Sequence, residues 1–296
     1  MNELKGLGTA LITPFKQDGS VDYEALARVL DTQLTGSVDY IVVLGTNGEA
    51  VTFSAEEKRE VRQFIVRYVH GRLPLVLGVG GNNTAQVIAD LQALKDELIR
   101  DFKAILSVCP FYNKPSQEGL FRHFTAIAEA SPLPVLLYNV PGRTGVNLLP
   151  ETVMRIYEAQ PEKIAGVKEA SGNVEQIKRL IALSQESGVK KQDKLLVISG
   201  DDGIAAEVMA AGGAGLISVA SNAFAEDFGR IVHDKDAALQ AKYTEMIRLL
   251  FAEGNPAGIK TVLAQKGLIE NVLRLPLVPN SENIQQQIHQ QIQLLK

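Results

Sequence analysis

The sequence predicts a closed (βα)8 barrel, a TIM barrel of the α/β class, followed by a small C-terminal helical extension. Eight short apolar runs alternate with polar, helix-forming segments, and the first seven begin about 30 residues apart, the length of a strand plus a helix. The rival architecture is a doubly wound open sheet, which seldom needs eight evenly spaced units. It should also carry a glycine-rich phosphate turn after its first strand, where this chain has Thr13 and Pro14.

The apolar runs are the predicted strands, because a short apolar run between polar segments is typical of a strand buried on both faces. They cover residues 8–15, 40–46, 73–80, 104–110, 134–140, 164–170, 195–201 and 214–221. The helices between them have recognisable starts. Ser54 and Glu57 form a capping box, and Asp22, Thr84 and Ser116 are further predicted N-caps.

The barrel is expected to occupy residues 1–237 and the extension residues 238–296. Three segments from residue 237 onward, 237–254, 255–268 and 281–296, read as helices with Gly, Asn and Pro between them. An extension of this size is too small for a secure core of its own. We therefore expect it to pack on the barrel or on a neighbouring subunit.

Composition excludes several classes of protein. The chain has 296 residues, 46% apolar and 22% charged, with a net charge of −4, and this mild acidity argues against a nucleic-acid binder. No apolar run approaches the roughly 18 residues of a membrane span, and the N-terminus lacks a secretory apolar region, so we expect a cytoplasmic protein without membrane contacts. Cys109 is the only cysteine and the four histidines lack ligand spacing, so we expect no disulfide within the chain and no metal.

The most informative residue is Lys168, near the end of the sixth predicted strand. Burial disfavours the charged form of an amine and can lower its pKa by up to roughly 3–5 units. A neutral amine attacks carbonyl carbons and forms Schiff bases. The alternative is a lysine that leans out of the strand end to pair with Glu169 or another carboxylate, and the apolar run alone favours neither interpretation.

Polar residues also follow other strands, at the ends where the βα loops of a barrel converge. Thr46 lies in the glycine-flanked turn 45–48, whose backbone N–H groups can face an anion. Tyr112 and Tyr138 can relay the protons that imine formation requires, and Arg143 can bind a carboxylate. Each alone has a simpler interpretation, such as a core tyrosine or a surface arginine. Their placement at one rim favours a site of the class I aldolase type.

Several segments resemble the dihydrodipicolinate synthase / N-acetylneuraminate lyase family, and the resemblance spans nearly the whole chain. They are GTALITPF at 8–15, PFYNKPSQEG at 110–119, YNVPGRTG at 138–145, NPAGIK at 255–260 and RLPL at 274–277. The resemblance implies a lyase that forms an imine with pyruvate. Segments 110–119 and 138–145 resemble the branch that condenses pyruvate with aspartate 4-semialdehyde on the diaminopimelate route to lysine. The alternative is a related aldolase acting on a sialic acid or a 2-keto-3-deoxy sugar acid; the neuraminate lyases lack the Arg143-Thr144-Gly145 step.

The resemblance also implies a role for each candidate residue. Lys168 would form the Schiff base, Tyr138 would transfer protons to and from the imine, and Thr46 would complete the relay. It further implies a homotetramer built as a dimer of dimers and no cofactor beyond the covalent imine. The remaining roles are Tyr112 contributed across a tight dimer interface, Asn47 and Arg143 for the pyruvate and semialdehyde carboxylates, and Gly200 and the Ile217 carbonyl lining the pyruvate pocket.

The chain departs from the family pattern in two places. Asn47 stands where the family usually has threonine, and its side-chain amide would replace a hydroxyl as a donor to the pyruvate carboxylate. In members inhibited by lysine, an effector pocket uses polar and acidic residues. The matching positions here are Ala50, Ala55, Lys58, Gln86 and Phe111, with only Asn82 retained. An added cation and a lost carboxylate oppose the binding of another ammonium, so we expect weak or absent lysine inhibition.

Overall fold

The computed structural model describes residues 2–94, 97–189 and 194–295. Within these residues, eight strands follow one another in sequence order around a closed barrel, and every pairing with a defined register is parallel. The predicted (βα)8 fold is therefore confirmed. The strands are β1 (Gly6–Ala10), β2 (Tyr40–Val43), β3 (Leu75–Gly78), β4 (Phe102–Val108), β5 (Val135–Asn139), β6 (Ile164–Glu169), β7 (Leu196–Ser199) and β8 (Gly215–Ser218).

All eight strands overlap their predicted runs, and most are shorter. The first run shows the reason: Leu11, Ile12 and Phe15 are buried but lie outside β1. Their apolar character reflects burial after the strand has ended and not membership of β1. Pro14 has no N–H to donate to a strand ladder, which also favours an early end.

Helices follow the eight strands along the chain. They are α1 (Tyr23–Thr35), α2 (Ala55–Val69), α3 (Thr84–Ala93), α4 (Gln117–Ala130), α5 (Pro141–Thr144), α6 (Pro150–Ala159), α7 (Val174–Glu186), α8 (Ala205–Ala210) and α9 (Ala225–His233). Short 3-10 helices are η1 (Asn2–Leu4), η2 (Thr46–Gly48), η3 (Ala50–Thr52), η4 (Glu97–Asp101), η5 (Asp202–Ile204) and η6 (Ala220–Asn222).

Three of the four predicted helix starts are confirmed. Asp22 and Ser116 accept hydrogen bonds from the first turns of their helices, and Ser54 forms both bonds of the capping box. The predicted N-cap at Thr84 is wrong, because Asn83 accepts from the N–H groups of Ala85 and Gln86. Asparagine is the stronger N-cap of the two neighbours, and the Thr84 hydroxyl lies 2.8 Å from Nδ1 of His123 instead.

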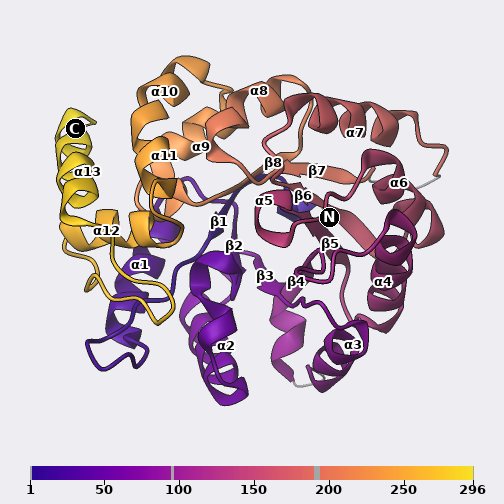
Figure 1. Cartoon of the computed structure of the whole chain (residues 1–296), viewed down its shortest axis with the longest axis horizontal. Helices are drawn as coiled ribbons and strands as arrows, with labels where there is room; N and C mark the ends of the chain where they lie inside the picture. The colour runs from indigo at the N-terminus through magenta and orange to yellow at the C-terminus, as the bar shows by residue number, and fades with distance from the viewer. Residues whose placement is uncertain (1, 95–96, 190–193, 296) are drawn as a thin grey trace. The chain divides into compact units, whose positions relative to one another are not determined.

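The chain divides into two compact units. The first comprises Met1–Gly6 and Pro74–Ile217, and the second comprises Leu7–Leu73 and Ser218–Lys296. In the first unit, α3, α4, α6, α7 and α8 pack side by side in chain order along the outside of strands β3 to β8 (Figure 1). The second unit holds most of β1, β2 and their helices together with the chain after β8. The predicted division at residue 237 stays a prediction.

Among the described residues, the chain from residue 237 onward contains four helices where three were predicted: α10 (Ala237–Lys242), α11 (Thr244–Phe251), α12 (Ala257–Gln265) and α13 (Glu282–Leu294). The first predicted helix is interrupted at Tyr243, which is buried with its ring against those of Phe224 and Phe228. Its hydroxyl donates to Asp227. Tyr243 is the residue between α10 and α11.

The extension packs on the start of the barrel within the second unit. Arg28 of α1 donates from Nε to the Leu268 carbonyl, 3.1 Å away, and Arg274 donates from Nε to the carbonyl of Gly19, 2.9 Å away. No helix among the described residues is both long enough and apolar enough to cross a membrane.

Candidate functional site

The structure brings Lys168 and Tyr138 together in the first unit. They are register partners on the neighbouring strands β5 and β6, so both side chains leave the sheet on the same face. Both are nearly buried, with 6% of Lys168 and 7% of Tyr138 exposed. The Lys168 Nζ lies 4.4 Å from the centroid of the tyrosine ring, which places the amine against the aromatic face.

Glu169 does not serve as the counter-ion of Lys168. It is fully buried, and alternation along β6 turns it to the opposite face of the sheet. Its carboxylate accepts hydrogen bonds from the Ser171 N–H at 2.8 Å, from Asn139 Nδ2 at 2.8 Å and from Gln176 Nε2 at 3.1 Å. These neutral donors satisfy Glu169, and the pairing considered from the sequence is wrong.

Gly200, the residue after β7, leaves room for the Lys168 side chain. A Cβ at this position would lie 2.9 Å from Lys168 Cε and 2.6 Å from Ala170 Cβ, both closer than real side chains approach. Its N–H donates to the Glu169 carbonyl at 2.7 Å, which fixes this close approach. Ile217, on β8, is fully buried.

Arg143 and Tyr112 are exposed residues of the same unit. Arg143 lies in the short helix α5, directly after β5. Tyr112 is 89% exposed and has φ of 74°, a conformation that is uncommon for a bulky residue. The loop around it is braced, because Asn82 Nδ2 donates to the Phe111 carbonyl at 3.1 Å and Asn113 Nδ2 donates to the Asn82 carbonyl at 2.9 Å.

Thr46 and Asn47 lie in η2 of the second unit, at the end of β2. Thr46 is exposed, whereas Asn47 is only 2% exposed. The Asn47 amide is bound at both ends by the protein: Nδ2 donates to the Ala10 carbonyl at 2.9 Å, and Oδ1 accepts from Asn255 Nδ2 at 2.7 Å. The side chain therefore braces the turn, a role that the sequence did not indicate.

A buried ionic cluster lies beside this turn and was missed by sequence reasoning. Lys260 of α12 and Glu49 form an ion pair of 2.5 Å with both side chains fully buried. Burial lowers the pKa of Lys260 to about 8, while Glu49 acts in the opposite direction. The sequence signal that could have indicated this pair is the position of Lys260 within the mostly apolar helical segment 259–263.

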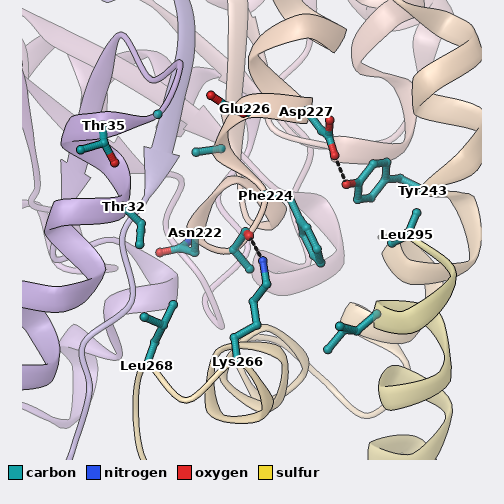
Figure 2. Close-up of a pocket in the computed structure, with 14 residues that line it drawn as sticks. Thr32, Thr35, Asn222, Phe224, Glu226, Asp227, Tyr243, Lys266, Leu268 and Leu295 are labelled. Atoms are coloured by element: carbon teal, nitrogen blue, oxygen red, sulfur yellow. Dashed lines mark hydrogen bonds between the residues drawn. The ribbon is translucent and has the colours of Figure 1, made fainter.

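A cleft of about 570 Å³ elsewhere in the second unit contains none of the predicted site residues. Figure 2 shows two hydrogen bonds among the residues that line it: Lys266 donates to the Ala223 carbonyl, and Tyr243 donates to Asp227. The Lys266 Nζ also lies 4.3 Å from the centroid of the Phe224 ring. Because these groups already have partners within the protein, they do not define a second binding site.

The described residues contain no group of three or more His, Cys, Asp or Glu side chains placed to hold a metal ion. Cys109 is fully buried, and burial raises the pKa of its thiol. Cys109 therefore packs as a small apolar residue, because the nucleophilic form of cysteine is the thiolate.

A barrel with a buried lysine against a tyrosine at the ends of paired strands defines a lyase of the class I aldolase type. The chain belongs to the dihydrodipicolinate synthetase family, whose model matches residues 3–295. This confirms the resemblance that the sequence motifs indicated.

The curated relatives and solved structures agree with this assignment. A relative from Parabacteroides distasonis is 49% identical over 93% of this chain and 92% of its own length, and one from Flavobacterium psychrophilum is 45% identical over 96% of both. Both are named 4-hydroxy-tetrahydrodipicolinate synthase. The dihydrodipicolinate synthase of Thermotoga maritima superposes with a TM-score of 0.92 at 35% identity, covering 98% of both chains. That of Acinetobacter baumannii, solved with pyruvate, has a TM-score of 0.89 at 36% identity over 98% of both.

Proposed function

We propose that this chain is a 4-hydroxy-tetrahydrodipicolinate synthase that condenses pyruvate with aspartate 4-semialdehyde in the biosynthesis of lysine through diaminopimelate. The observation that carries the proposal is the buried pair of Lys168 and Tyr138, with Nζ 4.4 Å from the ring centroid. Relatives with this name cover more than nine-tenths of the chain, at 49% and 45% identity.

The proposed chemistry starts with the Lys168 amine. Its nitrogen attacks the keto carbon of pyruvate, and the carbonyl oxygen leaves as water to give an imine. Loss of a proton from the methyl group gives an enamine, whose carbon attacks the aldehyde carbon of the semialdehyde and forms the new carbon–carbon bond. Tyr138 would move these protons, which the contact of its ring with the amine supports, and Thr46 and Tyr112 would extend the relay.

The remaining residues bind the substrates in this proposal. Because the Asn47 amide is held by Ala10 and Asn255, the turn would meet the pyruvate carboxylate with its backbone N–H groups. Gly200 and the Ile217 carbonyl would line the pyruvate pocket. Arg143, exposed in α5, would receive the semialdehyde carboxylate through its guanidinium fork.

We further propose that Tyr112 acts in the site of a partner subunit. A tyrosine that is 89% exposed in a braced, left-handed backbone conformation is consistent with a side chain that a partner would cover. The proposed assembly is a homotetramer made of two tight dimers. It would work in the cytoplasm without a metal or a cofactor.

Steady-state assays with separate substrates test the proposal. Product should form when the enzyme receives pyruvate and aspartate 4-semialdehyde together, and Lys168→Arg should abolish it. Cleavage of N-acetylneuraminate or of a 2-keto-3-deoxy sugar acid, with no product from the semialdehyde, would instead assign the chain to a related aldolase activity. Arg143→Ala should raise the semialdehyde KM more than the pyruvate KM.

A further inference from the structure

We propose that Lys260 and Asn255, from the C-terminal extension, are positioning residues that hold the turn carrying Thr46 and Asn47 in the shape that receives pyruvate. The inference rests on the proposed function, because it assigns pyruvate to that turn. The residues concerned all lie in the second compact unit. Neither positioning residue belongs to the barrel strands or to their loops.

The turn needs external support, because its backbone is strained on both sides. Leu44 has φ of 56° and Glu49 has φ of 54°, although neither is glycine. A non-glycine residue in the left-handed region is destabilised by steric contact with its own Cβ, and such residues persist where the surroundings hold them. Both are buried, with 8% of Leu44 and 2% of Glu49 exposed, so protein contacts supply that support.

The Glu49 carboxylate is held by the extension at both oxygens. Lys260 Nζ lies 2.5 Å from Oε1, and the Arg274 backbone N–H donates to Oε2 at 3.1 Å. Lys260 also donates to the Val272 carbonyl at 3.0 Å, and its Nζ lies 4.1 Å from the centroid of the Phe15 ring. A buried charge is costly unless it is paired, so each member of the pair fixes the position of the other.

Asn255 fixes the middle of the turn. It donates from Nδ2 to Asn47 Oδ1 at 2.7 Å, while Asn47 Nδ2 donates to the Ala10 carbonyl at 2.9 Å. Both asparagines are buried, with 2% of Asn47 and 7% of Asn255 exposed. The Asn47 side chain therefore forms hydrogen bonds with both β1 and the extension. Its backbone, and that of Thr46 before it, is set by the same two contacts.

A change in this support should alter the binding of pyruvate more than the chemical step. Lys168 and Tyr138, the groups proposed to react, belong to the other compact unit and are held there by the register of β5 and β6. Loss of binding energy that is shared by substrate and transition state raises KM and leaves kcat unchanged.

The experiment measures the pyruvate KM, kcat and the melting temperature of three variants. Lys260→Met removes the ammonium but leaves the Glu49 carboxylate buried alone, so this variant alone risks unfolding. The double variant Glu49→Gln/Lys260→Met removes both charges and retains an acceptor for the Arg274 N–H. Asn255→Ala removes the contact to Asn47. We expect each folded variant to raise the pyruvate KM by about tenfold and, because Thr46 of the same turn takes part in the proposed proton relay, to lower kcat by a smaller factor.

Lys266→Met is the matched control. Lys266 follows the last residue of α12 and, like Lys260, contacts an aromatic ring and donates to a backbone carbonyl, but it lines the cleft of Figure 2 and is not part of the Glu49 pair. Its pyruvate KM should equal that of the wild type. A folded double variant with lower melting temperature but an unchanged pyruvate KM would show a purely structural role and overturn the inference. If the wild type itself fails to use pyruvate, the proposed function fails first.

Discussion

Substitution of Gly200 tests whether the close packing around the Lys168 stem matters for imine formation. In Gly200→Ala, the new Cβ would lie 2.6 Å from Ala170 Cβ, 2.9 Å from Lys168 Cε and 3.1 Å from Lys168 Cγ. Overpacking of this kind costs about 1–3 kcal/mol. The lysine stem is the flexible partner, so part of the cost is relieved by moving its amine away from Tyr138.

We therefore expect Gly200→Ala to slow imine formation with pyruvate by about tenfold to a hundredfold, since about 1.4 kcal/mol corresponds to a factor of ten. The free energy of unfolding should fall by about 1–3 kcal/mol. Rapid-quench borohydride trapping gives the rate, and urea titration gives the stability. Gly188→Ala is the control, because a Cβ added there would meet no heavy atom of the described residues within 4 Å beyond its chain neighbours. An unchanged trapping rate in Gly200→Ala would refute the packing argument.

Three further predictions concern pH, the partner subunit and regulation. Burial lowers the pKa of His123 to about 4, so protonation of this side chain favours the unfolded chain. The neutral imidazole therefore contributes about 3 kcal/mol to the free energy of unfolding above the unfolded pKa of about 6.5, and this contribution should be lost as the pH falls toward 4. Urea titrations at pH 7.5 and 4.5 should show a smaller fall in the free energy of unfolding for His123→Gln than for the wild type. An equal fall in the two proteins would contradict the prediction. Tyr112→Phe should lower kcat by about tenfold to a hundredfold while leaving the fold intact, and unchanged kcat would exclude Tyr112 from the relay. Lysine should inhibit weakly or not at all, because the cation of Lys58 opposes the binding of another ammonium; half-inhibition by sub-millimolar lysine would contradict the prediction.

The barrel was predictable from the sequence because its signals are local and repeated. Each strand is an apolar run of its own, and the even spacing of the runs leaves few alternatives. The contact of Lys168 with Tyr138 was also accessible, since both residues stand near the ends of runs that are consecutive in the chain. Their register on β5 and β6 turns that proximity along the sequence into contact.

The contacts that hold the turn with Thr46 and Asn47 could not be predicted from local sequence signals. Asn255 and Asn47 are 208 residues apart, and neither has a local pattern that identifies its partner. The error at Thr84 has a different origin: two residues with capping ability are adjacent, and only the backbone geometry decides which of them caps α3. Sequence patterns indicate which kinds of side chain are present, whereas long-range polar pairing depends on the folded path of the chain.

The most direct test of the central claim is the mass of the protein after borohydride reduction in the presence of pyruvate. We predict one reduced pyruvate per chain, located on the peptide that carries Lys168, and none in Lys168→Arg. Modification spread over exposed lysines, or an unmodified Lys168 peptide under conditions of turnover, would contradict it.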